Sequence, residues 1–116
     1  MTVALRPSQA LSLWRNILSG LVQNGESDFT VRQLTILTTI YLDPPPHTVR
    51  GLAAKLGVSK PVITRALDSL GQKNLVSRRR DPADRRNVII QRTVEGSLYL
   101  EALGDRIINE AEVVTS

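Results

Sequence analysis

The sequence predicts a mainly α-helical fold with one small β-hairpin, and three observations support this fold class. Apolar residues recur at helical spacing in five segments, which are separated by glycine, proline or polar turns. Two short strand-like runs at residues 75–80 and 88–92 follow the fourth segment and flank a polar loop. Aromatic residues make up only 3% of the chain, so the core must be built from Leu, Ile, Val and Ala.

The first two helices are predicted by apolar spacing and by capping residues. Residues 8–24 carry apolar side chains at helical intervals and end at an Asn-Gly pair. Trp14 lies on this apolar stripe, so we expect it in the core or in a subunit interface. Thr30 and Gln33 then have the spacing of a capping box, which starts a second helix. That helix should end at about Leu42, because Asp43 and three prolines follow.

A helix-turn-helix is predicted by the residues that follow the prolines. Thr48 can cap a short third helix, Gly57 can end it in the left-handed conformation, and Ser59 can cap a fourth helix. A helix, a three-residue turn with glycine and a second helix form this motif. Asn74 is expected to take a left-handed conformation after the fourth helix, and His47 is expected on the surface. The core-facing residues of the fourth helix are spaced i, i+4, i+7: Ile63, Leu67 and Leu70.

Charge is segregated along the chain. Residues 50–92 contain eleven basic and three acidic side chains, a net charge of +8, so the remainder carries −4. This distribution is typical of a surface that neutralises phosphates, whereas purely solvating surfaces usually mix both signs. The loop at residues 81–87 is crowded with arginines, and a hairpin tipped with guanidinium groups can reach into a DNA groove. The sequence therefore predicts a DNA-binding protein.

Composition limits the other function classes. The chain has no cysteine and one histidine, which excludes disulfides and thiolate metal sites and predicts no metal or cofactor. Its longest uncharged runs are about half the length of a membrane-spanning helix, and its N-terminus lacks the pattern of a signal peptide. We therefore expect a cytoplasmic protein with no membrane partner. No nucleophile and base pair, glycine-rich phosphate loop or metal-ligand spacing suggests an enzyme.

The chain resembles the MarR family of bacterial winged-helix transcription regulators. The resemblance covers about residues 28–103 and depends most on the Asp-Pro-x-Asp-Arg-Arg motif at residues 81–86 and on Thr-x-x-Gly at residues 93–96. It implies a winged helix-turn-helix homodimer on a palindromic operator in double-stranded DNA. The implied organisation is a single domain, residues 1–116. Within it, residues 30–92 form a DNA-binding core, and residues 8–24 and 94–112 form two flanking dimerisation helices.

The resemblance also assigns contacts in the recognition helix and beside it. Recognition helices would enter successive major grooves, while phosphate contacts would fix position without reading sequence. The implied major-groove and phosphate contacts of the recognition helix are Ser59, Lys60, Pro61, Thr64 and Arg65. The implied phosphate contacts outside it are Arg50, Arg78 and Arg80.

In the wing, the resemblance implies that Asp84 braces an arginine and that Arg85 or Arg86 enters the minor groove. A narrow minor groove has an enhanced negative potential that attracts guanidinium groups, which agrees with the assignment of an arginine to this groove. The family usually ends with two long helices, and only about twenty residues follow Gly96. We expect the last dimerisation helix to be missing, so that dimerisation depends on the first helix and on a stripe of Leu100, Leu103 and Ile107. The absence of cysteine and the scarcity of aromatic residues do not favour a small-molecule effector.

The resulting prediction is a sequence-specific DNA-binding transcriptional regulator, acting as a repressor. The main alternative is an architectural protein that coats DNA with little specificity, because a charge-dominated binder would have a similar composition. A winged-helix module that binds protein is a further alternative. Such a module would be expected to lose arginines from the wing, which this chain keeps.

Overall fold

The computed structural model describes residues 4–23 and 29–116, and the chain divides into two compact units. Residues 30–100 form one unit, which we call the winged-helix unit. Residues 1–29 and 101–116 form the other, the terminal-helix unit. The expected role of the flanking helices in dimerisation is not tested by this division and stays a prediction.

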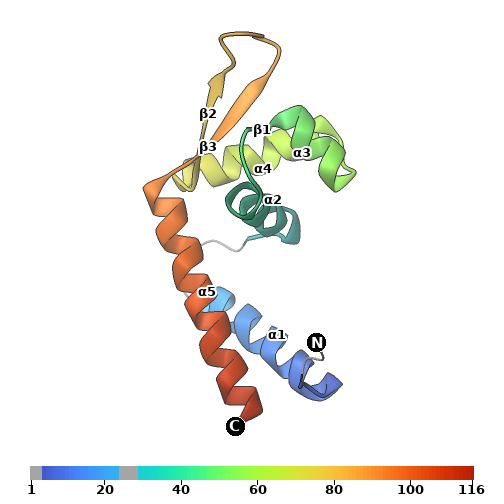
Figure 1. Ribbon diagram of the computed structural model, residues 1–116, viewed down its shortest axis with the longest axis vertical. Helices are drawn as coiled ribbons and strands as arrows, with labels where there is room; N and C mark the ends of the chain where they lie inside the picture. Colours follow the sequence, from blue (N-terminus) through green and yellow to red (C-terminus); the bar gives the residue numbers. More distant parts are fainter. Residues whose placement is uncertain (1–3, 24–28) are drawn as a thin grey trace. The chain divides into compact units, whose positions relative to one another are not determined.

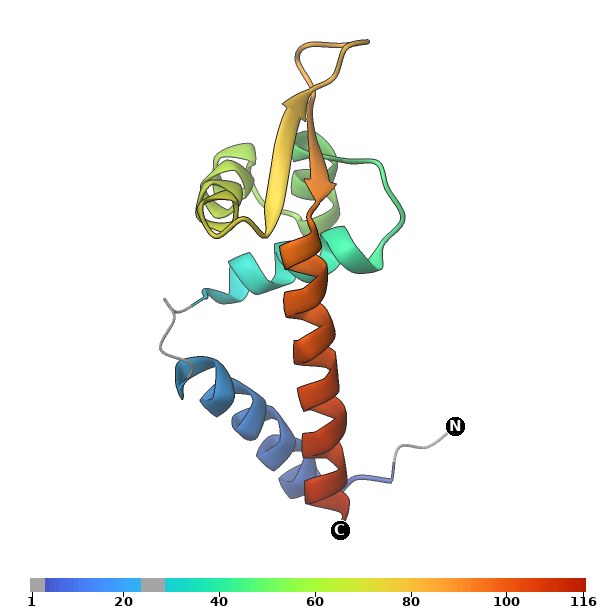
Figure 2. The same cartoon turned by 90° about the vertical axis from the view of Figure 1, so that its left-hand side faces the viewer.

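The winged-helix unit has the predicted mainly helical fold with a hairpin (Figure 1). Its elements are α2 (Val31–Leu42), β1 (His47–Thr48), α3 (Val49–Leu56), α4 (Lys60–Gln72), β2 (Val76–Arg80), β3 (Val88–Arg92) and the beginning of α5 (Val94–Thr115). The three strands form an antiparallel sheet in the order β1-β3-β2. Figure 2 shows that the hairpin of β2 and β3 leads directly into α5.

The helix boundaries follow from caps that the sequence predicted. Thr30 and Gln33 form the complete capping box of α2, and the Thr48 hydroxyl accepts from the N–H of Gly51 at 2.9 Å to cap α3. Gly57 ends α3 with φ of 67°, a left-handed conformation that costs glycine little. Asn74 also takes a left-handed conformation after α4, with φ of 59°. These four predictions are confirmed.

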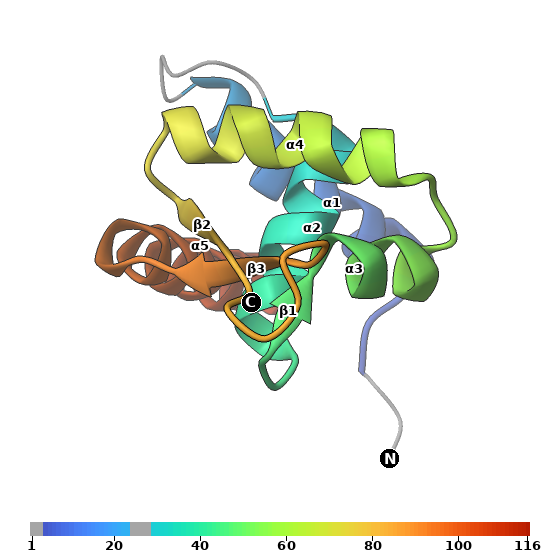
Figure 3. The same ribbon diagram turned by 90° about the horizontal axis from the view of Figure 1, so that it is seen from above.

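The core of the winged-helix unit is aliphatic, as its composition predicted. The predicted residues of α4, Ile63, Leu67 and Leu70, are fully buried. Their helix, α4, packs against α2, α3 and β2. Figure 3 shows α4 beside β2, with α3 on the side of β1 and β3. Each buried Leu or Ile contributes about 1.5 to 3 kcal/mol, so this cluster fixes the orientation of α4.

The prediction that His47 lies on the surface is wrong. Its side chain is buried, and its Nε2 lies 3.1 Å from the carbonyl oxygen of Asp43. His47 belongs to β1, where it pairs with Ile90 of β3. A two-residue strand has no periodicity that a sequence could reveal, and its existence depends on a partner more than forty residues away.

The terminal-helix unit contains α1 (Pro7–Gln23) and the second half of α5. The predicted end of the first helix, at Asn24 and Gly25, lies outside the described residues. Gln9 donates to the carbonyl oxygen of Val114 at 2.9 Å, which ties the two helices together. Trp14 is 56% exposed, so it does not lie in the core of the chain, and its expected place in a subunit interface stays a prediction. No helix in the described part of the chain combines the length and apolar character that a membrane span requires.

Candidate nucleic-acid interface

The helix-turn-helix positions α4 through a tight turn. The N–H of Val58 donates to the carbonyl oxygen of Ala53 at 3.1 Å, which closes the end of α3 around Gly57. The Ser59 hydroxyl then accepts from the N–H of Val62 at 3.4 Å, so it caps α4 as predicted. Pro61 lies in the first turn of α4, where its missing N–H costs nothing. The backbone therefore fixes α4, the candidate recognition helix, independently of any ligand.

The outward face of α4 carries the predicted contact residues. With its apolar residues buried, the helix exposes short, polar or cationic side chains on the other side. Arg65 has no hydrogen-bond or ion-pair partner among the residues that the structure describes, so its guanidinium is available to a ligand. The predicted contact residues of α4 and its cap, all exposed, are Ser59, Lys60, Pro61, Thr64 and Arg65.

The wing loop is ordered by Asp84, and the arginine that Asp84 holds is Arg86. One carboxylate oxygen of Asp84 accepts from the Arg86 Nε at 3.1 Å and from the Arg86 backbone N–H at 3.1 Å. The other oxygen accepts from the Arg86 Nη2 at 3.2 Å. The expected bracing is thus present in the geometry, and its partner is the second of the two candidate arginines.

These contacts lower the pKa of Asp84 below its ordinary value. The largest cause is the hydrogen bond from the Arg86 side chain, and the Arg86 backbone N–H and the charge of Arg50 act in the same direction. Because the pKa is depressed, the pairing persists at neutral pH and is lost only as the pH falls through the folded-state pKa. The Asp84 carboxylate is therefore ionised at neutral pH and can accept these hydrogen bonds.

Arg85 lies between these contacts and keeps its guanidinium free. Its backbone carbonyl accepts from the Nη1 of Arg80 at 3.0 Å, which holds the loop without using the Arg85 side chain. The loop is also closed by a hydrogen bond from the N–H of Asn87 to the carbonyl oxygen of Asp84 at 2.9 Å. The Arg85 side chain is exposed and has no partner in the described parts of the chain.

The predicted phosphate contacts outside α4 are less free than the sequence suggested. Arg78 is paired with Asp68 of α4 at 2.8 Å, so it joins the wing to the recognition helix. Arg80 is committed to the Arg85 carbonyl. Arg50 is exposed near the start of α3, and its charge is felt by Asp84. All three remain on the surface, and the first two also have structural contacts.

Arg92 is a structural residue that the charge count included among the candidates for DNA. Its Nε donates to the carbonyl oxygen of Ile40 and its Nη2 to that of Asp43, both at 2.9 Å. These are carbonyl groups at the end of α2, where a cation is favoured by the helix dipole. The guanidinium also lies 5.7 Å from the centre of the Tyr41 ring. Sequence reasoning had no signal for this role, because the contacts span about fifty residues.

Among residues 4–23 and 29–116, no group of three or more His, Cys, Asp or Glu side chains could hold a metal ion.

Comparison with known proteins agrees with this geometry. A MepR mutant from S. aureus bound to an oligodeoxyribonucleotide is similar, with a TM-score of 0.78 and 25% identity over 91% of this chain and 75% of that chain. The transcriptional regulator Tm0710 from Thermotoga maritima has a TM-score of 0.70 and 28% identity over 93% of this chain and 70% of that chain. A MarR mutant from E. coli complexed with operator DNA has a TM-score of 0.70 and 25% identity, over 90% and 72% of the two chains.

Sequence comparison with curated proteins found no match. The sequence model of the MarR family, however, matches residues 29–88, which include the helix-turn-helix, β2, the wing loop and the first residue of β3. This match covers more than half of the chain, and the similar structures share its fold over about nine-tenths of its length. The chain belongs to the MarR family.

Proposed function

We propose that this protein is a sequence-specific DNA-binding transcriptional regulator that acts as a cytoplasmic homodimer and represses its target genes. In each subunit, α4 enters the major groove and the wing lies over the adjacent minor groove. The observation that carries the proposal is that the arginines of the wing loop and of the recognition helix have two different roles. Asp84 and Arg86 order the loop, while Arg85 and Arg65 keep guanidinium groups that have no partner in the described chain.

Specificity distinguishes this function from that of an architectural DNA-coating protein. We expect selection from random DNA duplexes to yield a palindromic motif, because two copies of α4 related by twofold symmetry read two half-sites. Arg65 can pair bidentately with guanine, which gives about 1 to 3 kcal/mol of discrimination. The measurement is sequencing of the duplexes that the parent and the Arg65→Ala variant each select. Selection of duplexes with no common motif would support the architectural alternative.

The proposed dimer is supported by apolar side chains on the helices of the terminal-helix unit. On α1, Leu11 is 69% exposed and Trp14 is 56% exposed, and Ile107 of α5 is 39% exposed. Exposed apolar stripes of this kind usually mark association. The predicted interface residues on the two helices are Leu11, Trp14, Leu18, Leu100, Leu103 and Ile107.

We expect a dimer in sedimentation at micromolar concentration, and a shift to monomer in the Leu11→Asp and Trp14→Asp variants. A charge placed in a desolvated apolar interface costs several kcal/mol. Both side chains are exposed in the single chain, so the variants should keep their helical circular dichroism. Gln23→Glu, at an exposed position of α1 that helical geometry turns away from Leu11, Trp14 and Leu18, is the control for one added acidic charge on α1. A parent protein that sediments as a monomer would contradict the proposed dimer.

A further inference from the structure

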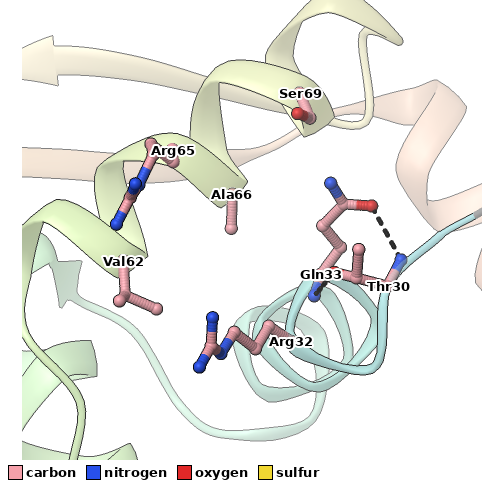
Figure 4. Close-up of a pocket in the computed structure, with 7 residues that line it drawn as sticks. All are labelled: Thr30, Arg32, Gln33, Val62, Arg65, Ala66 and Ser69. Atoms are coloured by element: carbon pink, nitrogen blue, oxygen red, sulfur yellow. Dashed lines mark hydrogen bonds between the residues drawn. The ribbon is translucent and has the colours of Figure 1, made fainter.

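A groove lies between the N-terminus of α2 and one flank of α4, within the winged-helix unit. Its volume is about 300 Å³, and Arg32 of α2 and Arg65 of α4 both line it. Figure 4 shows Val62 between the guanidinium groups of Arg65 and Arg32, with Ala66 further along α4. Thr30, Gln33 and Ser69 supply the remaining polar lining. Residue spacing alone does not connect Arg32 with the recognition helix.

The described residues that line this groove include two arginines and no acidic side chain. Neither Arg32 nor Arg65 has an ion-pair or hydrogen-bond partner in the described portion of the chain, whereas Arg78, Arg86 and Arg92 all do. Two like charges at one site repel each other in the free protein, and an anion bound between them would remove that repulsion. The groove therefore has the electrostatic character of an anion site.

The position of the groove on α4 indicates which anion. Val62, Arg65, Ala66 and Ser69 follow i, i+3, i+4, i+7 spacing, so they form one stripe along the helix. Successive residues of a helix are turned by about 100°, which places this stripe on the flank opposite Thr64 and Asp68. Asp68 pairs with Arg78 of the wing strand. The groove thus lies on the flank of α4 that faces away from the wing.

A recognition helix in a major groove meets a phosphate backbone on both flanks. The major groove is about 12 Å wide, and a helix with its side chains is about 10 to 12 Å across. One backbone is therefore adjacent to the wing side of α4, where Arg50 and Arg78 lie. The other backbone must pass the opposite flank, where Arg32 and Arg65 line the groove.

We propose that the groove between α2 and α4 binds one backbone phosphate of the duplex. Arg32 is the principal contact of this phosphate, and Arg65 lies where it can reach either the phosphate or a base. The proposal rests on the proposed DNA-binding function. It adds Arg32 to the contact surface and gives α2 a direct part in binding. The occupant is a phosphodiester of DNA, and a free inorganic anion is the competing occupant that the experiments below exclude.

The test is the salt dependence of DNA binding by the Arg32→Gln variant. Loss of one phosphate contact should reduce the slope of log K against log salt by about 0.9 per subunit. Affinity at low salt should fall roughly five- to tenfold, by the same factor on selected and on random duplexes, because a phosphate contact carries no sequence information. Arg32→Lys should keep the slope, because it keeps the charge. Arg6→Gln, an exposed arginine outside the winged-helix unit, should change neither quantity.

The Arg32→Gln substitution should not affect DNA binding through a change in folding. The capping box of α2 uses the Thr30 and Gln33 side chains and leaves the Arg32 side chain out, so the melting temperature should not change. If the parent binds DNA and Arg32→Gln binds with the same slope, the inference is wrong and the DNA-binding function stands. If the parent binds neither selected nor random duplexes, the proposed function is wrong.

A second experiment identifies the occupant. Duplexes with one neutral methylphosphonate at each position in turn should weaken the parent at every phosphate that it contacts, and Arg32→Gln should be insensitive at one of these positions per half-site. Inorganic phosphate, titrated into the free protein and followed by NMR, is the probe for the competing occupant. Phosphate shifts at Arg32 together with unchanged DNA binding by Arg32→Gln would show a small-anion site and overturn the proposal.

Discussion

Replacing Gly96 with alanine is expected to destabilise the winged-helix unit by about 2 to 4 kcal/mol, through overpacking and the loss of a buried hydrogen bond. Gly96 lies in the first turn of α5 and is buried. A Cβ at this position would overlap both the Tyr41 hydroxyl and the carbonyl oxygen of Leu75. The second of these is backbone at the start of the wing, so it cannot move without shifting β2.

The crowding at Gly96 has a structural purpose. The Tyr41 hydroxyl donates to the carbonyl oxygen of Leu75 and accepts from the N–H of Thr93, both at 2.8 Å. The Thr93 hydroxyl accepts from the N–H of Gly96 at 2.9 Å and donates to the carbonyl oxygen of Asn74 at 2.7 Å. Thr93 and Gly96 of the Thr-x-x-Gly motif thus join α2, the entry to β2 and the start of α5. Only a residue without a side chain leaves room for this network.

Denaturant unfolding of the parent and the variant measures the effect. The control is Gly71→Ala in α4 of the same unit, where an added Cβ would lie at an ordinary 4.0 Å from the carbonyl oxygen of Val76. That control should gain stability, about 0.5 to 1 kcal/mol, because alanine restricts the unfolded chain more than glycine does. Equal stabilities of the Gly96→Ala variant and the parent would mean that the network yields without cost.

Local signals explain why so much of the fold could be predicted. The capping box at Thr30, the left-handed Gly57 and the cap at Ser59 each depend on residues within a few positions of one another, and each is confirmed. The core face of α4 was predictable for the same reason, since its helical period is a property of one segment. These signals agree with one another, and that agreement is what allows a short sequence to specify a single fold.

Long-range contacts explain what could not be predicted. His47 appeared to be a surface residue because its burial depends on pairing with Ile90. Arg92 appeared to be one more cation for DNA, although it caps the end of α2 fifty residues away. The place of Arg32 could not be predicted, because only packing brings the start of α2 beside α4. In all three cases the residue type was visible in the sequence and the partner was not.

The seven-residue wing loop also has one feature that the sequence predicts and one that only the structure decides. The family resemblance implied that Asp84 would brace an arginine, and either Arg85 or Arg86 satisfied the spacing. The loop geometry decides for Arg86, which contacts Asp84 through both its side chain and its backbone N–H. That choice has a functional consequence, because it assigns the free guanidinium to Arg85.

We therefore expect Arg85→Ala to reduce DNA affinity tenfold or more, which corresponds to about 1.4 kcal/mol. A guanidinium in a narrow minor groove interacts with its enhanced negative potential, and alanine loses this interaction. Thermal stability should be nearly unchanged, because Arg85 contributes to loop order through its carbonyl group, which alanine keeps. Titration against one selected duplex and thermal unfolding measure the two effects. Loss of stability together with affinity would assign Arg85 a structural role instead.

The bracing role of Asp84 gives the last expected result, whose sign differs from that of a simple charge effect. Asp84→Ala removes a negative charge near phosphates, which by charge alone would strengthen binding. It also releases Arg86 and the loop, so that more freedom is lost on binding, and we expect affinity roughly two- to tenfold lower, the range for ordering one side chain. Asp84→Ala should cost less affinity in the Arg86→Ala background than in the parent, because the Arg86 side chain supplies two of the three hydrogen bonds between these residues. Glu112→Ala, which removes an exposed acidic charge from α5, controls for net charge. If Asp84→Ala binds more tightly than the parent, the wing acts through its charge and the order of its loop contributes nothing.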